Sequence, residues 1–352
     1  MSPPAWSLNC PIPIDAGADR VTLAHGEGAR LSRQLLAEHI LPRLSRGAPV
    51  DWRDAAHVTS GGVRLALTTD SFVVTPLFFP GGDIGSLAVH GTVNDLAVSG
   101  ARPQWLTLSL ILEEGLPLAV LDAVLDSVAR AAADCSVSIV AGDTKVVPSG
   151  AADGLFLTTT GIGELIDPVP AGPQSIRPGD VILVSGPIGR HGVAVLCVRE
   201  EFGFDPPPQT DSAPLLRAVE LLRYSAGDEV RAIRDATRGG VSAVLHEWSA
   251  AGDVSFLLDE SQIPVTEDVR GACEVLGLDP LHIACEGTLV AAVSEAAAEA
   301  ALGALRADSR FANAAIIGRS IGRRLTPVAL RMPFGGDRPL DEPAGSLLPR
   351  IC

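Results

Sequence analysis

The sequence predicts two domains in which strands and helices are interleaved, an α+β or α/β fold. The first observation is length, because 352 residues correspond to about two domains of roughly 150 residues each. The second is composition, since 47% apolar and 20% charged residues are ordinary for a well-buried globular protein. The third is that short apolar runs alternate with segments of helical periodicity in both halves of the chain.

The first half of the chain is expected to begin with a loose leader over residues 1–20. Apolar residues at helical spacing then predict a helix from Leu31 towards Pro42, and a hairpin around Gly61 leads into a strand that ends at Asp70. The remaining elements of this half are expected in the following order: a Gly-rich loop over 78–85, a helix carrying Asn94 and Asp95, a strand over 104–112, an amphipathic helix over 118–134, a buried strand over 137–140 and a closing strand over 155–163.

The second half is predicted to begin at Pro178-Gly179-Asp180, which precedes an apolar strand over 181–186. Further helices are expected over 213–224 and after Asp235, and further strands over 289–293 and 314–318. Residues 332–346 are too rich in Pro and Gly for a helix. A dozen extended residues reach about 40 Å, so the final Cys352 would be carried on a long tether. Taken alone, the tail is better explained as a frayed terminus with an accidental cysteine.

Charge and cysteine usage argue against several function classes. A net charge of −15 offers no basic stripe for nucleic acid. No apolar run of membrane-spanning length and no signal peptide is recognisable, so we expect a cytoplasmic protein with no membrane contact. The six cysteines form no C-x-x-C pair and the seven histidines no H-E-x-x-H, which disfavours zinc. A P-loop and a dinucleotide fingerprint are also lacking in the sequence.

Six aspartates share a position just after a strand or in a Gly-containing turn. They are Asp54, Asp70, Asp83, Asp95, Asp143 and Asp235. Magnesium prefers oxygen ligands, so several carboxylates around one nucleotide would fit a magnesium–nucleotide site. Any one of these aspartates, taken singly, is better explained as a turn former or a helix N-cap.

Two further residues are candidates for chemistry. Lys145 is the single lysine among the 27 Lys and Arg residues, so either a compact ammonium or an amine with a tunable pKa is predicted to be needed at that position. Glu286 precedes an apolar strand and could present a base at its end. A solvated surface position is the alternative for each of them.

Six motifs and the terminal Pro349-Arg350-Ile351-Cys352 resemble the HypE family, the carbamoyl dehydratases of hydrogenase maturation in the aminoimidazole ribonucleotide synthetase-like (PurM-like) superfamily. The motifs are Thr68-Thr69-Asp70-Ser71, Phe79-Pro80-Gly81-Gly82-Asp83-Ile84-Gly85, Gly91-Thr92-Val93-Asn94-Asp95-Leu96-Ala97-Val98, Ala141-Gly142-Asp143-Thr144-Lys145-Val146, Asp235-Ala236-Thr237-Arg238-Gly239-Gly240 and Ala284-Cys285-Glu286-Gly287. Selenophosphate synthetase and thiamine phosphate kinase share such motifs, whereas the tail that ends in cysteine separates HypE from them.

The resemblance implies a two-domain α+β fold of the PurM-like kind. After the leader, residues 21–165 would form an ATP-binding and dimerisation domain, 166–335 a C-terminal domain and 336–352 a flexible tail that carries Cys352. A homodimer would form through the N-terminal domains, with ATP and Mg²⁺ bound near their interface.

The resemblance also implies a reaction. Cys352 would receive a carbamoyl group from the carbamoyltransferase HypF, and ATP-dependent dehydration would convert that group to a thiocyanate. The HypC–HypD complex would take it as the cyanide ligand of [NiFe]-hydrogenase iron. Matching positions give Cys352, Lys145 and Glu286 as catalytic. They give Asp54, Asp83, Asp95 and Asp235 as magnesium ligands, with Asp70, Asn94, Asp143 and Thr144 also at the nucleotide.

The physical chemistry agrees with such a reaction, because an amide oxygen leaves readily only after phosphorylation, and two N–H protons must also be removed. Glu286 is the preferred base and Lys145 is the alternative, and the choice between them stays open. Two alternatives are a relative that phosphorylates a free small molecule, and a non-catalytic adaptor whose tail docks into a partner.

Overall fold

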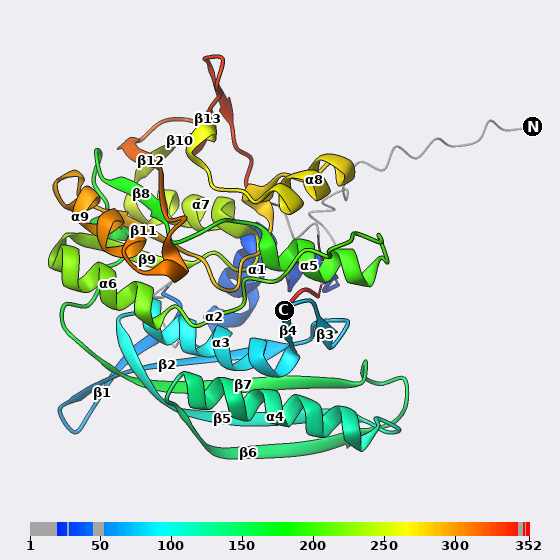
Figure 1. Cartoon of the computed structure of the whole chain (residues 1–352). Helices are drawn as coiled ribbons and strands as arrows, with labels where there is room; N and C mark the ends of the chain where they lie inside the picture. The colour runs from blue at the N-terminus through cyan, green and yellow to red at the C-terminus, as the bar shows by residue number, and fades with distance from the viewer. Residues whose placement is uncertain (1–19, 27, 45–52, 344–347, 349) are drawn as a thin grey trace, which may run out of the picture.

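A computed structural model describes residues 20–26, 28–44, 53–343, 348 and 350–352, so most of the predicted leader lies outside it. Its two larger sheets correspond to the two halves of the chain (Figure 1). The first has the strand order β1-β2-β7-β5-β6. Its strands are β1 (Ala56–Ser60), β2 (Val63–Phe72), β5 (Ala101–Glu113), β6 (Ser138–Val147) and β7 (Leu155–Leu165).

The predicted hairpin is confirmed between β1 and β2. Ser60 pairs with Val63 across a two-residue turn in which Gly61 and Gly62 have φ angles of 58° and 85°. Such tight turns require the left-handed region at both central positions, which glycine enters without steric cost. A short pair, β3 (Phe78–Phe79) and β4 (Gly82–Asp83), follows in the predicted Gly-rich loop.

Helices α3 (Ile84–Val98) and α4 (Leu118–Asp134) pack on the first sheet, and α4 has the predicted bounds. Helix α3 is buried on almost every side, which fits its largely apolar sequence. It contacts strands β2 and β7 of the first sheet and also helix α6 (Leu216–Ala226) and strand β9 (Val230–Asp235) of the second half. Helix α3 is therefore the central element between the two domains.

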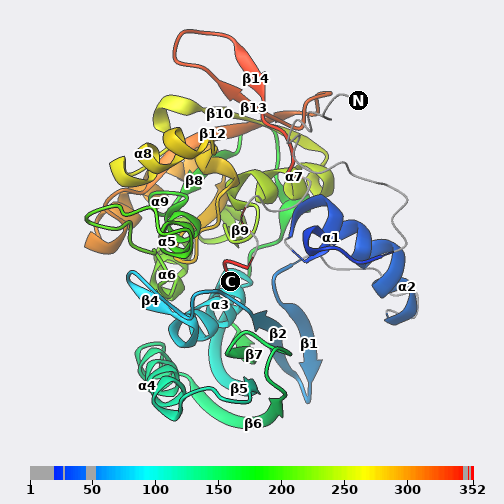
Figure 2. The same ribbon diagram turned by 90° about the vertical axis from the view of Figure 1, so that its right-hand side faces the viewer.

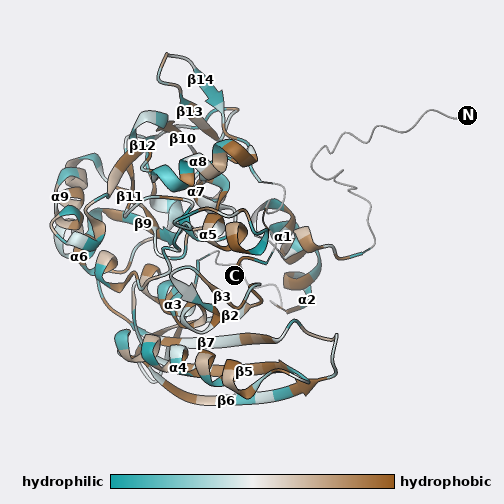
Figure 3. Cartoon of the chain, turned by 45° about the vertical axis from the view of Figure 1, so that its right-hand side comes forward, coloured by the Kyte–Doolittle hydropathy of each residue, from teal (hydrophilic) through white to brown (hydrophobic). Residues whose placement is uncertain are grey.

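A strand is confirmed from residue 138 onwards, but the prediction that it is buried is wrong. Strand β6 begins at Ser138, pairs with β5 and is the edge strand of its sheet, and its side chains from Ser138 to Val146 are exposed. On β5, Leu106 and Leu108 face the helices, while the alternate residue Trp105 is exposed. The apolar run thus lies on an exposed edge strand. Figure 3 shows hydrophobic residues along β5 and β6.

The second sheet has the order β14-β13-β10-β12-β8-β11-β9. Besides β9, its strands are β8 (Val181–Val184), β10 (Val254–Asp259), β11 (Leu289–Val293), β12 (Ala315–Gly322), β13 (Val328–Arg331) and β14 (Asp337–Pro339). The helices of this half besides α6 are α5 (Arg190–Arg199), α7 (Gly240–Gly252), α8 (Glu267–Leu276) and α9 (Glu295–Arg306). Most strand pairs in both sheets are antiparallel, so the fold is α+β.

The second sheet is buried on both faces at its strands β8 and β11. Along β11, Val290 and Ala292 pack with α7, whereas Leu289, Ala291 and Val293 pack with α6 and α9. This period of two is that of an extended strand between two helical layers. The apolar run predicted over 289–293 is confirmed as a core strand.

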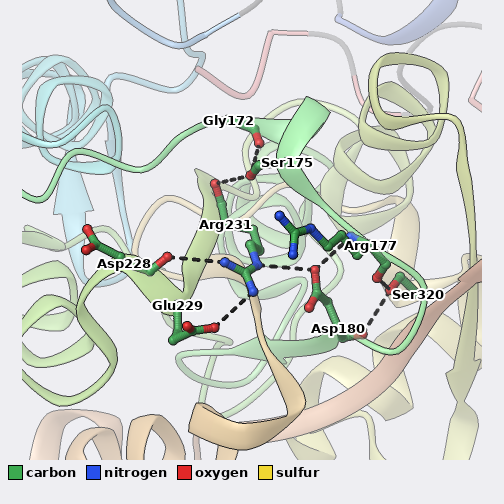
Figure 4. A network of polar contacts seen from close by, with 8 residues as sticks. All are labelled: Gly172, Ser175, Arg177, Asp180, Asp228, Glu229, Arg231 and Ser320. Carbon is green, nitrogen blue, oxygen red and sulfur yellow. Dashed lines mark hydrogen bonds and ion pairs between the residues drawn. The ribbon is translucent and has the colours of Figure 1, made fainter.

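A polar network fixes the segment that enters the second domain (Figure 4). The Asp180 carboxylate accepts from the main-chain N–H of Arg177 at 2.8 Å, and its main-chain oxygen accepts from the N–H of Ser320 at the same distance. The Arg231 side chain lies 3.6 Å from Asp180 and 2.9 Å from Glu229. The predicted start at Pro178-Gly179-Asp180 is thereby attached to β9 and β12.

The two ends of the described chain lie against the main body. A helical segment over residues 29–44 comprises α1 (Ala29–Leu35), a π-helical turn (Leu36–Ile40) and α2 (Leu41–Leu44). Strand β14 pairs with β13, although it falls inside the predicted tail. The C-terminus lies between the domains in both views (Figures 1 and 2). Within the described residues, the helices are too short or too polar to span a membrane.

Candidate active site

A cavity of about 570 Å³ opens between the two domains. Its lining comes from β2, α3, the β9–α7 connection, the N-terminal helical segment and the end of the chain. Six of the residues predicted for the site line it: Asp54, Asp70, Asp95, Asp235, Glu286 and Cys352. Residues separated by almost 300 positions in the sequence therefore face one space.

Three of these aspartates form a compact cluster. Asp54 precedes β1, Asp95 lies on α3 and Asp235 ends β9, and one carboxylate oxygen from each lies within 4.8 Å of the other two. Burial raises the pKa of Asp54 to about 6 and that of Asp235 to about 8, and it raises the pKa of Asp95 well above its ordinary value. Buried carboxylates that converge in this way are the ligands that a hard divalent cation prefers, so the cluster fits Mg²⁺.

A chain of ion pairs supports the cluster from one side. The Nε of Arg234 lies 2.9 Å from the Asp54 carboxylate, and its Nη1 lies 2.5 Å from Glu247 on α7. Glu247 in turn lies 3.4 Å from Arg33 on α1, which also pairs with Glu342. Because Arg234 directly pairs with only one aspartate of the cluster among these contacts, negative charge is left for a cation.

Glu286 is held rigidly at the edge of the cavity. Its side chain is 2% exposed, and its main-chain N–H and that of Gly287 both donate to the Asp211 carboxylate at 3.1 Å. A Cβ at Gly287 would lie 1.7 Å from the main-chain oxygen of Asp211, so only glycine fits there. Burial, reinforced by the charges of Asp235 and Asp211, raises the pKa of Glu286 well above its ordinary value.

The end of the chain is docked in the cavity. The main-chain oxygen of Cys352 accepts from the N–H of Val73 at 3.0 Å, and that of Arg350 accepts from Thr75 at 3.4 Å. The pKa of Arg238, which also lines the cavity, is raised chiefly by the negative charge at Cys352. This structure therefore places the terminal cysteine inside the site; the prediction of a flexible tail stays a prediction.

Two of the predicted site residues, Asp83 and Asn94, make contacts that support the fold. The Asp83 carboxylate caps α3 by accepting from the N–H groups of Gly85 and Ser86 at 2.8 and 3.0 Å, and it also accepts from Ser127. Asp83 does not belong to the cluster of three. The predicted roles of Asp83 at the metal and of Asn94 at the nucleotide stay predictions.

Asn94 links the domains through its side-chain amide. It donates to the main-chain oxygens of Ala213 and Glu286 at 3.1 and 3.2 Å, and it accepts from the N–H of Leu215 at 2.7 Å. These contacts favour a role in joining α3 to the second domain.

Asp143, Thr144 and Lys145 lie on the exposed strand β6 and do not line the cavity. The Lys145 ammonium is 2.6 Å from the Asp143 carboxylate, and this pair lowers the pKa of Asp143. Lys145 pairs in register with Ile111 of β5, whose side chain is exposed. Residues in register share a face, so Lys145 lies on the open face of the sheet.

Sequence reasoning missed several residues of the site. Arg238 lies inside the motif Asp235–Gly240, which therefore contained a signal for it, and Arg234 directly precedes that motif. The residues without such a signal are Arg33, Glu247 and, at the docked tail, His191.

Comparison with known proteins agrees with this geometry. The models of the AIR synthase related protein family match residues 52–165 for the N-terminal domain and 177–329 for the C-terminal domain. The carbamoyl dehydratase HypE of Cupriavidus necator is 46% identical over 346 residues, and the match covers 97% of each chain. The chain belongs to the HypE family.

Solved structures of the HypE family have the same fold. A HypE–HypF complex contains a chain that is 42% identical with a TM-score of 0.82, over 88% of this chain and 99% of that one. HypE in complex with ATP is 42% identical with a TM-score of 0.78, over 95% of this chain and all of that one. The PurM-like α+β prediction is confirmed, whereas the domain boundaries at 165 and 335 stay predictions.

Proposed function

We propose that this HypE-family chain dehydrates a carbamoyl group carried on the thiol of its own Cys352. The product is a thiocyanate, which supplies the cyanide ligand for the iron of [NiFe]-hydrogenase. The observation that carries the proposal is that Cys352 and Glu286 line the same cavity as the cluster of three aspartates. The names of the relatives and their complexes with HypF and ATP support it.

The cluster of Asp54, Asp95 and Asp235 is proposed to hold Mg²⁺ together with ATP in the cavity. When bound, the ion would offset negative charge on the phosphoryl group in transfer. Asp70 lines the same cavity and is assigned to the nucleotide. Arg238 also lines it and offers a guanidinium to phosphate oxygens, and Gly26 and Gly28 line the cavity beside it.

The proposed reaction uses ATP to turn the carbamoyl oxygen into a leaving group. The carbamoyl oxygen attacks the γ-phosphorus, which forms an O–P bond and releases ADP. Loss of both nitrogen protons and cleavage of the C–O bond then release phosphate and leave the S–C≡N group. The carbamoyl oxygen ends in the released phosphate.

Glu286 is proposed as the base that takes a nitrogen proton. Its raised pKa brings the carboxylate closer to the operating pH than an exposed glutamate, which makes it a stronger base. Its position is fixed through the contacts of its main chain with Asp211 and Asn94. The tether holds the reacting group at high effective concentration beside this base.

A homodimer built on the open face of the first sheet is proposed as the active form. Exposed large side chains on this face include Val58, Val63, Trp105 and Ile111. Lys145 shares this face, but three strand spacings of about 4.8 Å separate β6 from β2, whose Thr69 and Ser71 line the cavity. In a two-fold dimer, Lys145 of one copy could instead serve the site of the other.

The proposed partners follow from the same reaction. HypF would supply the carbamoyl group, and the HypC–HypD complex would receive the cyanide. Both steps require the tail to leave the cavity, and we assign them to the cytoplasm.

An oxygen-isotope experiment tests the proposal. Carbamoyl phosphate labelled with heavy oxygen at its carbonyl group is supplied with HypF and ATP, and the phosphate released in the dehydration step is analysed by mass spectrometry. We expect the heavy oxygen in that phosphate, and none from the Cys352→Ser variant. Phosphate that takes its oxygen only from water would show that ATP is merely hydrolysed and would overturn the proposal.

A further inference from the structure

The docked end of the chain is held through three successive main-chain oxygens. Those of Arg350 and Cys352 accept from Thr75 and Val73, as described above, and that of Ile351 accepts from the Nε2 of His191 at 2.6 Å. His191 is thus the side chain that completes the set. The Ile351 side chain is 2% exposed, so the last residues are seated rather than laid on the surface.

The contacts of His191 define its protonation. Burial lowers the pKa of His191, so the ring is neutral. The Ile351 oxygen can only accept, so Nε2 must carry the hydrogen, and Nδ1 then accepts from the Thr210 hydroxyl at 2.8 Å. The Phe79 ring packs edge-on against the imidazole at a centroid distance of 5.4 Å. Thr210 therefore selects the tautomer that can bind the tail.

The same loop also positions Glu286. Thr210 orients His191, and its neighbour Asp211 accepts from the main-chain N–H groups of Glu286 and Gly287. Two adjacent residues thus set the place of the docked tail and the place of the proposed base.

We propose that His191, oriented by Thr210, is a positioning residue that holds the tail in the docked state by its bond to the Ile351 carbonyl. The inference rests on the proposed dehydration at Cys352. In that reaction, the hydrogen bond from His191 would fix the substrate-bearing residue relative to Glu286. It acts before any chemistry, so the docking itself can be measured on the unmodified chain without ATP or HypF.

A matched pair of variants tests the proposal. In His191→Gln the amide nitrogen can replace Nε2 and still donate to Ile351, whereas His191→Asn can reproduce only the contact of Nδ1. Full-length proteins are treated with a carboxypeptidase, and loss of Cys352 is followed by intact mass. Loss of one hydrogen bond predicts roughly three- to tenfold faster release of Cys352 from His191→Asn. Release from His191→Gln should stay near the wild-type rate.

Several outcomes would overturn the inference. They are wild-type release from His191→Asn, or equal acceleration in the Asn and Gln variants. Thr210→Val gives a second reading without altering His191, and we expect an acceleration smaller than that of His191→Asn. Unchanged release from Thr210→Val would contradict the role given to Thr210. Thermal unfolding of each variant controls for loss of the fold.

This test is separate from that of the proposed function. Faster release from His191→Asn together with a wild type that forms no thiocyanate would leave the docking role standing and sink the dehydration. Thiocyanate formation by the wild type, together with an unchanged release of Cys352 from His191→Asn, would support the dehydration and overturn the docking role of His191.

Discussion

Several acidic side chains that line the cavity have raised pKa values. Glu286 and the cluster of Asp54, Asp95 and Asp235 all have raised pKa values, first of all because they are buried. Isolated carboxylates avoid such positions, since burying a charge without a partner is costly. Their convergence beside the terminal Cys352 is what distinguishes this site from a set of turn-forming aspartates.

Replacement of Glu286 by Gln tests the assignment of the base. Gln keeps the volume and can stay in the buried position, but it cannot take a proton. We expect dehydration to slow by about 10²- to 10⁴-fold, the usual contribution of a general base. Carbamoylation of Cys352 by HypF should continue, which the mass of the terminal peptide would show. A rate within a few-fold of wild type would assign the base to another group.

The stability of the metal-free protein should depend on pH through the cluster. The folded pKa values of Asp54 and Asp235, about 6 and about 8, lie above their ordinary value of 3.8. Their contribution to stability is therefore complete below that ordinary value and is lost as pH rises through the folded values.

In the presence of a chelator, we expect Tm to fall as the pH is raised from about 5 to about 8. Mg²⁺ should restore more of the loss at the higher pH, because it binds the ionised carboxylates. Asp235→Asn should flatten the profile. A Tm that rises over this range in the metal-free wild type would contradict the assignment.

At the scale of elements, helix α3 connects the two domains and one wall of the site. It carries Asp95 in the cluster and Asn94 in the contact between the domains, and it begins at the Asp83 cap. Its N-cap therefore influences the place of the cluster. Stabilising this helix terminus and binding metal are separable roles for Asp83.

Substitutions at Asp83 can separate those roles. Loss of the cap in Asp83→Ala should cost about 1 kcal/mol and lower Tm, whereas Asp83→Asn retains a good cap. If the predicted role at the metal is also real, Asp83→Asn should lose ATP turnover while keeping its Tm. Full ATP turnover in Asp83→Asn would leave Asp83 with the structural role alone.

Sequence patterns predicted elements well where local chemistry decides them. The hairpin at Gly61-Gly62 needs left-handed residues, and α4 shows its amphipathic period, so both are visible locally. The environment of β6 was mispredicted because its apolar residues resemble a core strand. Whether a face is covered depends on distant elements or on another chain, which periodicity does not contain.

The site was predictable to the extent that its residues occupy recognisable motifs. Asp54, Asp70, Asp95, Asp235, Glu286 and Cys352 were named from the sequence and line one cavity. His191 and Glu247 were missed because they lie on ordinary helical stretches, and their partners are remote along the chain.

At the scale of the whole molecule, the open face of the first sheet decides whether one chain is sufficient. Lys145 lies on this face and outside the cavity of its own chain. Mixing two inactive proteins tests whether a second copy supplies it. One carries Lys145→Ala and keeps Cys352, and the other carries Cys352→Ser and keeps Lys145.

When the two variants are mixed and their dimers are dissociated and allowed to reassociate, the mixture should regain thiocyanate formation. Random pairing of equal amounts gives about a quarter of the wild-type number of complete sites if the lysine acts across a two-fold dimer. Each variant alone serves as the control. A mixture as inactive as its components would place Lys145 in the same chain as the cysteine it serves, or outside the reaction.

The central claim is that Cys352 carries the group that is dehydrated in this cavity. The most direct measurement is the mass of the C-terminal peptide after incubation with HypF, carbamoyl phosphate and ATP. We expect a carbamoyl adduct on Cys352 that loses one water in an ATP-dependent step in the wild type and persists as the carbamoyl form in Glu286→Gln. A Cys352 that stays unmodified while this protein still consumes ATP would contradict it.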